Sequence, residues 1–386
     1  MRVAYVCTDP GVPVWGGKGA SVHVQAVLRV LVRRGHEVHL LAARTGGAAP
    51  ADLDGVVVHP LPAVGRGPAA EREVAATRSD AAVAGLLDGL GPLDLLWERY
   101  ALWGRTATSW AAARGVPSVL EVNAPLVEEQ AEHRELVDRA GAERVAREAL
   151  SAATAVVAVS DPVADWARSR SRHPRRVVTV PNGVDADRVV PGPFRAAPDP
   201  FVVGFVGTLK PWHGTEVLVD AHALLAATDP SWRLLLVGDG PCAAALRARA
   251  TAAGTAHLVE CTGAVAPPDV PALLQRMDVA TAPYPPLDGS YFSPLKVYEY
   301  LAAGLPVVAS AVGQVPQALD GGRLGELVRP GDAADLARAL AALRADPARR
   351  QALSRAGRAA AVQRHTWDAV VDRVLGHALG PAAGVA

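Results

Sequence analysis

A single carboxylate, Glu299, lies inside a segment that is otherwise almost all apolar or aromatic: residues 293–303 read SPLKVYEYLAA. Proline is tolerated in the first turn of a helix, where the backbone N–H groups have no helical partner. We therefore predict a helix that begins near Pro294. Its free N–H groups could hold a phosphate, and a carboxylate a turn and a half later could accept hydrogen bonds from a ribose diol. A salt bridge or a helix cap is the alternative for Glu299.

A second candidate phosphate site is the segment GTLKPWHG at 207–214, between a predicted buried strand and a predicted helix. Lys210 and His213 place basic side chains near a helix N-terminus, which suits a diphosphate. A surface loop with an incidental lysine is the alternative.

The next two predicted strands end in glycine-containing turns. Gly238 lies in the first turn, and Gly263 and Val265 follow the second strand. The carboxyl ends of parallel strands meet at one edge of a sheet. The first segment, taken alone, is only a turn, whereas the backbone after the second strand could face a flat nucleotide base there.

A glycine-rich loop, GVPVWGGKGASVHV at 11–24, joins the first predicted strand to the first predicted helix. Glycines let backbone N–H groups approach an anion at a helix N-terminus. The loop lacks the third glycine of the dinucleotide fingerprint GxGxxG, although Arg44 could mimic an NADP-selecting arginine. A plain turn is another alternative. We favour a loop that closes over a phosphate or a sugar.

Asp185 and Asp187 form a DxD pattern in VPNGVDADR, which superficially suggests a metal site. Asn-Gly favours a turn, and an aspartate side chain in a turn can bond the local backbone. We predict a turn here and no metal.

Strands that alternate with helices must position these residues. Such alternation predicts βαβ units and parallel sheets covered on both faces. The series occurs twice, so we predict an α/β fold of two facing doubly wound, Rossmann-like domains, residues 1–192 and 193–386. The proline-rich stretch 189–201 is the expected hinge. The ligand cleft is expected between the domains. The last helix, 366–379, could pack back on the first domain. Strands are expected at 2–7, 37–43, 56–62, 93–100, 117–123, 155–160, 201–207, 232–238, 257–263 and 278–284, and helices at 20–34, 70–90, 128–151, 215–227, 244–254, 270–277 and 332–345.

Composition excludes several classes of protein. The chain has 386 residues, half of them hydrophobic. A chain of this length usually folds into more than one domain, each with its own hydrophobic core. Basic and acidic residues balance at 39 each, so no nucleic-acid partner is indicated. Three widely spaced cysteines predict buried free thiols. The N-terminus does not resemble a signal peptide and no long apolar run occurs, so we expect a cytoplasmic protein, with peripheral membrane contact unsupported by any pattern.

The motifs GGKGASVHV, VPNGVD, GTLKPWHG, VGDGP and SPLKVYEYLAAGLPVVAS occur in this order. Together they resemble the retaining glycosyltransferases of family 4, which have the GT-B fold, over nearly the whole chain. The resemblance implies transfer of a hexose-type sugar from a nucleotide diphosphate sugar, without a metal or other cofactor and with retention at the anomeric carbon. UDP is favoured over GDP by family frequency. The acceptor, whether small molecule, saccharide, lipid or peptide, and the oligomeric state are not indicated.

The resemblance also implies roles by position. Glu299 would hold the ribose hydroxyls, the amides around 293–295 would hold the phosphates or the donor hexose, and the glycine loop would lie against the diphosphate. The implied donor-binding residues are Gly16, Gly17, Thr208, Lys210, His213, Gly238, Gly263, Val265, Tyr291, Phe292, Ser293, Pro294, Leu295, Lys296 and Glu299.

The chain departs from the family pattern in three ways, at four positions. Tyr291 stands where a second glutamate is usual, Thr208 and His213 stand where an arginine and a lysine hold the diphosphate, and Asn123 replaces a histidine. Lys210 or Lys296 could supply the missing charge.

We predict that Lys210, His213 and Asn123 act in catalysis, since the departing diphosphate needs charge stabilisation. The leaving phosphate can itself take the acceptor's proton, so no protein base is required. Lys18, Glu98, Arg99 and Asn123 are predicted on the acceptor side. Rim salt bridges or caps are the alternatives for Glu98, Arg99 and Asn123. A nucleotide-sugar epimerase of the same fold and a catalytically silent binding protein are the alternative functions.

Overall fold

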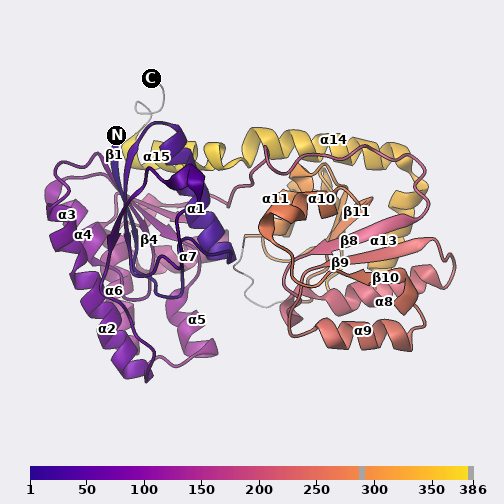
Figure 1. Ribbon diagram of the computed structural model, residues 1–386, viewed down its shortest axis with the longest axis horizontal. Helices are drawn as coiled ribbons and strands as arrows, with labels where there is room; N and C mark the ends of the chain where they lie inside the picture. The colour runs from indigo at the N-terminus through magenta and orange to yellow at the C-terminus, as the bar shows by residue number, and fades with distance from the viewer. Residues whose placement is uncertain (287–290, 292, 381–386) are drawn as a thin grey trace. The chain divides into compact units, whose positions relative to one another are not determined.

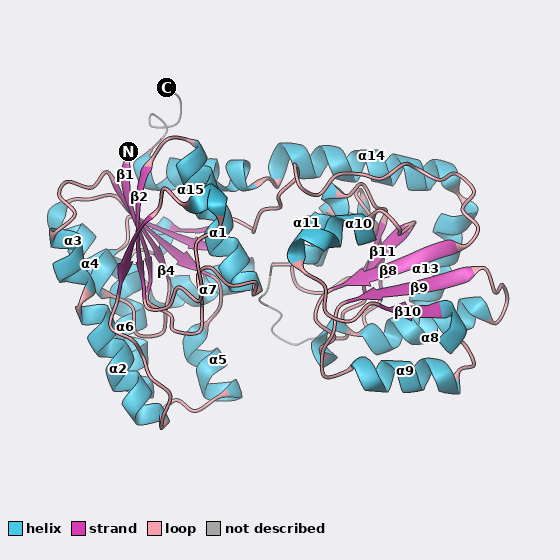
Figure 2. Ribbon diagram, in the orientation of Figure 1, coloured by secondary structure: helices cyan, strands magenta, loops and turns pink. Residues whose placement is uncertain are grey.

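A computed structural model describes residues 1–286, 291 and 293–380. Contacts divide the chain into two units, Met1–Asn182 with Trp367–Ala386 and Gly183–Thr366. Each unit is built on one parallel sheet with helices packed on it (Figures 1 and 2). The predicted α/β class with two doubly wound sheets is confirmed. The first boundary falls at Asn182, before the proline-rich stretch 189–201 in which we expected the hinge.

Unit 1 contains a seven-stranded sheet of order β3-β2-β1-β4-β5-β6-β7. Its strand order reverses between β1 and β4, which pair in parallel register from Val3↔Leu95 to Cys7↔Arg99. The strands are β1 Arg2–Cys7, β2 Glu37–Ala42, β3 Val57–Pro60, β4 Leu95–Arg99, β5 Ser118–Val122, β6 Ala155–Ala158 and β7 Val177–Thr179. The helices are α1 Gly19–Arg33, α2 Ala69–Ala81, α3 Val83–Asp88, α4 Thr106–Arg114, α5 Leu126–His133, α6 Arg139–Ala152, α7 Asp161–Arg170 and α15 Trp367–Leu379.

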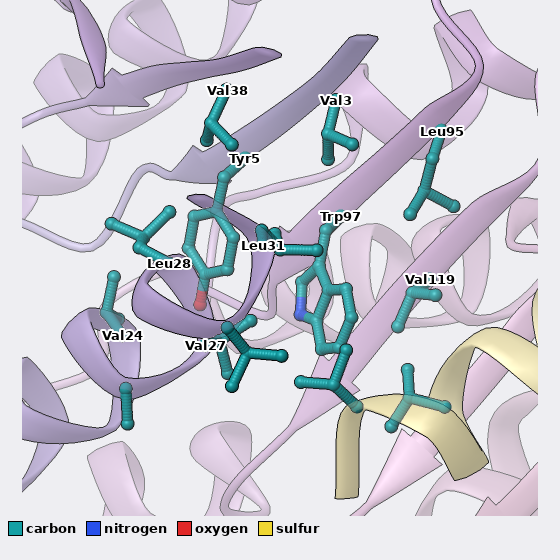
Figure 3. Packing of buried hydrophobic residues seen from close by; sticks show 14 of the residues in the cluster. Val3, Tyr5, Val24, Val27, Leu28, Leu31, Val38, Leu95, Trp97 and Val119 are labelled. Atoms are coloured by element: carbon teal, nitrogen blue, oxygen red, sulfur yellow. The ribbon is translucent and has the colours of Figure 1, made fainter. Parts of the chain in front are cut away.

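The core of unit 1 combines the first sheet strands with α1 and the distant helix α15. Tyr5 and Trp97 stack with ring centroids 6.3 Å apart (Figure 3). The apolar stripe of α1 packs on them, because its hydrophobic residues recur at helical spacing. Val371 and Val374 of α15 belong to the same buried cluster. The last helix therefore completes the core begun by the first strand.

Unit 2 contains a six-stranded sheet of order β10-β9-β8-β11-β12-β13. Its order reverses between β8 and β11, where Val203 pairs with Val279. The strands are β8 Phe201–Val206, β9 Trp232–Val237, β10 Val259–Cys261, β11 Val279–Ala282, β12 Val307–Ser310 and β13 Glu326–Val328. The helices are α8 Thr215–Ala226, α9 Ala243–Ala252, α10 Val270–Leu274, α11 Leu295–Ala302, α12 Val315–Ala318, α13 Ala333–Ala345 and α14 Pro347–Arg364.

Several predicted elements differ in detail. The helix expected at 128–151 is two helices, because the Asp138 carboxylate accepts a hydrogen bond of 2.8 Å from the N–H of Gly141 and caps a separate α6. The helix expected at 70–90 is likewise divided, into α2 and α3. Elements that we did not expect include α7, β7, β13 and α14. No helix within the described ranges is both long and apolar enough to cross a membrane.

Candidate active site

The carboxyl edge of the unit 2 sheet brings together the loops after β8 and β9. Gly238 has a φ of 133°, and a Cβ on it would collide with the carbonyl oxygen of Gly207. A side chain is therefore excluded where these loops cross. Gly238 also forms an isolated bridge with Gly263. Val265 is half-buried beside the core, so three of the predicted donor-binding residues follow adjacent strands of one sheet.

Lys296, in the first turn of α11, lies at this edge. Its ammonium is 3.3 Å from the phenol oxygen of Tyr284 and 5.2 Å from the centroid of the Phe205 ring. Its Cε lies 3.4 Å from the place that a Cβ of Gly207 would occupy. Among the described residues no carboxylate is within ion-pair distance of it. Burial lowers the pKa of Lys296 to about 7, and the charge of Glu299 only partly offsets this.

His213 lies on the other side of the same cluster, in a 3-10 turn at Pro211–His213. Its Nδ1 hydrogen-bonds the carbonyl oxygen of Thr208. Since a carbonyl can only accept, the proton of neutral His213 lies on Nδ1. Burial and the charge of Lys296 lower the pKa of His213 to about 4. His213 is therefore neutral at pH 7. Two other basic side chains lie here, Lys296 and Lys210, and Lys210 Nζ is 5.4 Å from the centroid of the Trp212 ring.

Glu299 is half-buried on α11, with no hydrogen bond to its carboxylate among the described residues. Burial raises its pKa, against the charges of Arg188 and Lys296. Neither the salt-bridge nor the cap alternative is realised among the residues that the structure describes. If a ligand displaced water from the Glu299 carboxylate, hydroxyl groups of that ligand would have to donate hydrogen bonds to it, because an unpaired buried charge is costly.

The segment before α11 is only partly described. Pro294 occupies the N-cap position and α11 begins at Leu295, close to where we predicted it. Ser293 is buried and Leu295 is at the margin of exposure. Tyr291 is half-buried, and Phe292 lies outside the described residues.

In unit 1 the glycine-rich loop is fixed by a buried glutamine. The side-chain N–H₂ of Gln25, on α1, donates to the carbonyl oxygens of Val14 (2.7 Å) and Gly16 (2.9 Å). Gly17 has open space on its Cα, and Lys18 is exposed at the N-cap of α1. The loop is therefore a positioned structure rather than a plain turn.

Asn123 and Arg99 belong to a buried network around Glu121. The amide nitrogen of Asn123 donates to Glu121 Oε1 at 2.6 Å, and His23 Nε2 lies 2.6 Å from the same oxygen. The Trp97 indole N–H donates to Oε2 at 3.0 Å. Burial of Glu121 opposes ionisation, but His23, Arg99 and Asn123 together lower its pKa to about 2. Glu121, on β5, thus holds Asn123 just after β5 and Arg99 at the end of the neighbouring strand β4.

Glu98 is not an acceptor contact in this structure, which corrects our prediction. Its side chain is fully buried, and Oε2 accepts a hydrogen bond of 3.1 Å from the N–H of Thr108 in the first turn of α4. The cap alternative is therefore realised. Burial and the charge of Asp80 raise the pKa of Glu98 to about 8, so it is protonated at neutral pH.

The DxD pattern behaves as predicted, since Asp185 Oδ1 accepts a hydrogen bond of 3.0 Å from the N–H of Arg188. The cysteines are free thiols, of which Cys7 is buried and Cys242 and Cys261 are half-buried.

Comparison with known proteins shows the family to which the chain belongs. The model of Glycosyltransferase Family 4 matches residues 17–188, and that of Glycosyl transferases group 1 matches residues 200–346. A D-inositol 3-phosphate glycosyltransferase of Actinosynnema mirum is 32% identical over 390 residues, covering 92% of this chain and 91% of that protein. The chain belongs to glycosyltransferase family 4.

Other family 4 relatives and GT-B structures agree. A phosphatidyl-myo-inositol mannosyltransferase of Mycobacterium leprae is 32% identical over 57% of each chain. The structure of HepE from Anabaena with UDP and glucose has a TM-score of 0.68 at 20% identity, covering 97% of this chain and 98% of that one. A glycosyltransferase from Rickettsia africae has a TM-score of 0.71 at 15% identity over 99% of both chains. The predicted GT-B fold and glycosyltransferase class are confirmed.

Two features of this family 4 enzyme escaped the sequence. Gln25 and Glu121 organise unit 1, but each is one polar residue in an apolar helix or strand, with nothing to reveal its partners. The signal available in the sequence was a polar residue inside an apolar run. Such a residue is expected to be buried and to need a hydrogen-bond partner. Tyr284 was noticed only as the end of a strand, because its contact with Lys296 joins two segments separated by a loop.

Proposed function

We propose that this glycosyltransferase moves a hexose from UDP-hexose to an acceptor hydroxyl with retention at the anomeric carbon and without a metal. The supporting observation is Lys296, a desolvated cation with no carboxylate partner among the described residues, at the point where the strand order of unit 2 reverses. Such reversal points are where open α/β sheets bind ligands. A diphosphate is the anion that this position suits.

The chemistry follows from the charges. The bond between the anomeric carbon and the diphosphate oxygen breaks, and the acceptor oxygen bonds to that carbon on the same face. The acceptor's proton goes to the departing diphosphate. Lys296, Lys210 and the first N–H groups of α11 stabilise the negative charge that develops. Glu299 accepts from the ribose hydroxyls, and His213, neutral at physiological pH, packs the site rather than supplying charge.

The donor and acceptor are chosen for testing from similar proteins. HepE was solved with UDP and glucose, so UDP-glucose is the first donor. The relatives act, by their names, on D-inositol 3-phosphate or phosphatidyl-myo-inositol, so polyol acceptors come first.

The test is nucleotide release from UDP-, GDP- and dTDP-sugars, with the product's anomeric configuration read by NMR. We expect UDP release with an axial-to-axial outcome for an α-linked donor, unaffected by a chelator. Conversion of the sugar without release would indicate an epimerase, and tight binding without turnover on any donor would indicate a silent protein.

Glu299→Gln tests the ribose assignment separately. We expect the variant to lose its preference for UDP over 2′-deoxy-UDP, a loss of about tenfold or more in affinity for UDP. Unchanged discrimination between the two nucleotides would rule out Glu299 as the ribose acceptor.

A further inference from the structure

Residues 185–189 enter unit 2 ahead of its sheet, and the catalytic scheme above gives them no part. This segment, which we call the brace, contains the DxD pattern and ends at Val189, which is only 2% exposed. Val189 belongs to the same buried cluster as Tyr298 and Leu301 of α11. The brace therefore packs with the helix on which Glu299 lies.

Arg358 fixes the brace to α11. It lies on α14, which packs against α11 (Figure 1). One terminal nitrogen of its guanidinium donates to the carbonyl oxygens of Val189 (2.9 Å) and Ala302 (2.8 Å), and the other donates to that of Ala186 (3.0 Å). Because Ala302 is the last residue of α11, the brace cannot move away from this helix without breaking these bonds.

Arg188, within the brace, reaches the loop that follows β10. Its guanidinium donates to the carbonyl oxygen of Pro267 at 2.8 Å, and Pro267 comes two residues after Val265, in the loop that could face the nucleotide base. Asp185 holds this arginine in turn. Its Oδ1 accepts from the backbone N–H of Arg188 at 3.0 Å, and its Oδ2 lies 3.8 Å from Arg188 Nε. The first aspartate of the DxD pattern thus orients an arginine.

The charge of Arg188 also acts on Glu299. Burial raises the pKa of Glu299, and Arg188 opposes this rise more strongly than Lys296 does. An ionised carboxylate accepts stronger hydrogen bonds from hydroxyl groups than a protonated one. The brace is therefore linked to the base side of the site by a hydrogen bond and to the ribose side by charge.

We propose that Arg188 is a positioning residue for the nucleotide: with Arg358 it fixes the loop after β10 relative to α11, so that the base and the ribose of one UDP molecule are held together. This role rests on the proposed UDP-sugar donor. Fixing two halves of a site before the ligand arrives improves affinity, because less freedom is lost on binding. The diphosphate contacts proposed above do not involve Arg188, so it should act on the nucleoside half alone.

Arg195 provides a matched control. Its side chain is 41% exposed, against 38% for Arg188, and it also contacts one backbone carbonyl and one aspartate. Its guanidinium lies 3.3 Å from the carbonyl oxygen of Arg276 and 2.8 Å from Asp278 Oδ2. Asp278 precedes β11, at the amino edge of the sheet, whereas the proposed nucleotide groups follow the carboxyl ends. Arg195→Gln therefore removes similar contacts at the other edge.

The test measures the binding of UDP, 2′-deoxy-UDP and pyrophosphate to the full chain by calorimetry, together with thermal melting. The variants are Arg188→Gln, Arg188→Lys, Arg195→Gln, Glu299→Gln and the double substitution of Arg188→Gln with Glu299→Gln. Arg188→Gln and Arg195→Gln should melt at similar temperatures, because each loses one carbonyl contact and one aspartate contact.

Arg188→Gln should lower UDP affinity about tenfold and change pyrophosphate affinity by less than about twofold, since only the nucleoside half is disturbed. It should also discriminate less between UDP and 2′-deoxy-UDP. Arg188→Lys keeps a charge and a donor, so it should recover most of the loss. In the Glu299→Gln background the same Arg188→Gln change should cost only about threefold, because part of its effect passes through Glu299.

Three results would overturn the role of Arg188: Arg188→Gln binds UDP as well as the natural chain, Arg195→Gln loses as much UDP affinity, or pyrophosphate affinity falls as far as UDP affinity. A different result addresses the proposed function. If the natural chain bound pyrophosphate but none of UDP, GDP and dTDP, the nucleotide-sugar donor itself would be refuted, and the role of Arg188 with it.

Discussion

The ammonium nitrogen of Lys296 lies 3.3 Å from the phenol oxygen of Tyr284 and 4.9 Å from the centroid of its ring. An aromatic face and a hydroxyl therefore hold this cation, in place of the carboxylate that buried lysines usually need. A lysine held in this way has no carboxylate to compete with an incoming anion, and its burial makes it easier to deprotonate.

Replacing Lys296 by methionine should lower UDP affinity by about ten- to a hundredfold, because a charge-assisted contact to the diphosphate is lost. The free energy of unfolding without ligand should stay equal or rise by about 1 kcal/mol, since an apolar chain replaces a desolvated cation. Calorimetry and thermal melting measure the two quantities. Arg323→Gln, which removes a surface ion pair with Asp320, is the control and should change neither strongly. A weaker fold together with unchanged UDP affinity would contradict the assignment.

The same lysine makes UDP binding dependent on pH. Its pKa of about 7 without ligand means that raising the pH through 7 deprotonates it and weakens binding, whereas a bound diphosphate favours the protonated form. UDP binding near pH 7 should therefore take up protons. Calorimetry in two buffers of different ionisation enthalpy measures this uptake, which Lys296→Met should reduce. Equal proton uptake in the variant would assign the effect to another group.

Glu98 should make the fold less stable as the pH rises. Its folded pKa of about 8 exceeds the ordinary value of 4.5, so the folded chain holds a proton that the unfolded chain releases between these values. Stability from this group is complete below about pH 4.5 and is lost as the pH rises toward 8. Glu98→Gln keeps an acceptor for the Thr108 N–H and removes the titration. Urea unfolding at pH 6 and pH 9 should show a smaller decrease for the variant, and parallel curves would argue against a buried neutral carboxyl.

Gln25→Met should release the glycine-rich loop while preserving the volume of the side chain. Two buried hydrogen bonds to backbone carbonyls are lost, which should cost about 1–3 kcal/mol of unfolding free energy. Chemical denaturation measures this cost, and proteolysis near Gly16 should become faster. Gln314→Met, on a polar side chain buried in unit 2, provides the comparison. Loop cleavage that is no faster in Gln25→Met than in Gln314→Met would mean that the loop does not depend on Gln25.

Two glycines at the edge of the unit 2 sheet should respond differently to alanine. Both have positive φ, 133° at Gly238 and 72° at Gly263, but only at Gly238 would a Cβ meet backbone, whereas Gly263 faces open space. Gly263→Ala should cost about 1 kcal/mol of stability, and Gly238→Ala about 3 kcal/mol or more. Thermal melting of both variants checks the difference. Similar losses would mean that the loops after β8 and β9 can separate freely.

The sequence predicted most of the fold because hydrophobic period and turn residues are local signals. Gly35, with a φ of 73°, ends α1 as its type and position indicated. What it could not predict depends on residues far apart in the chain. The carboxylate of Glu98 looked like a surface ligand at a strand end, and only the position of α4 shows that it caps a helix. Likewise Lys296 was one of two candidate cations until its contact with Tyr284 distinguished it.

The position of α15 has a consequence for synthesis in the cell. Its side chains belong to the core that β1 and α1 begin, although more than three hundred residues separate them, so Trp367 meets His23 with ring centroids 4.7 Å apart. As the chain leaves the ribosome, the first half of unit 1 emerges early, but its core can be completed only after α15 has been synthesised. Unit 2 is fully translated one helix earlier. Genetic fusion of halves from two such enzymes would therefore need two crossover points, one before Gly183 and another near Trp367.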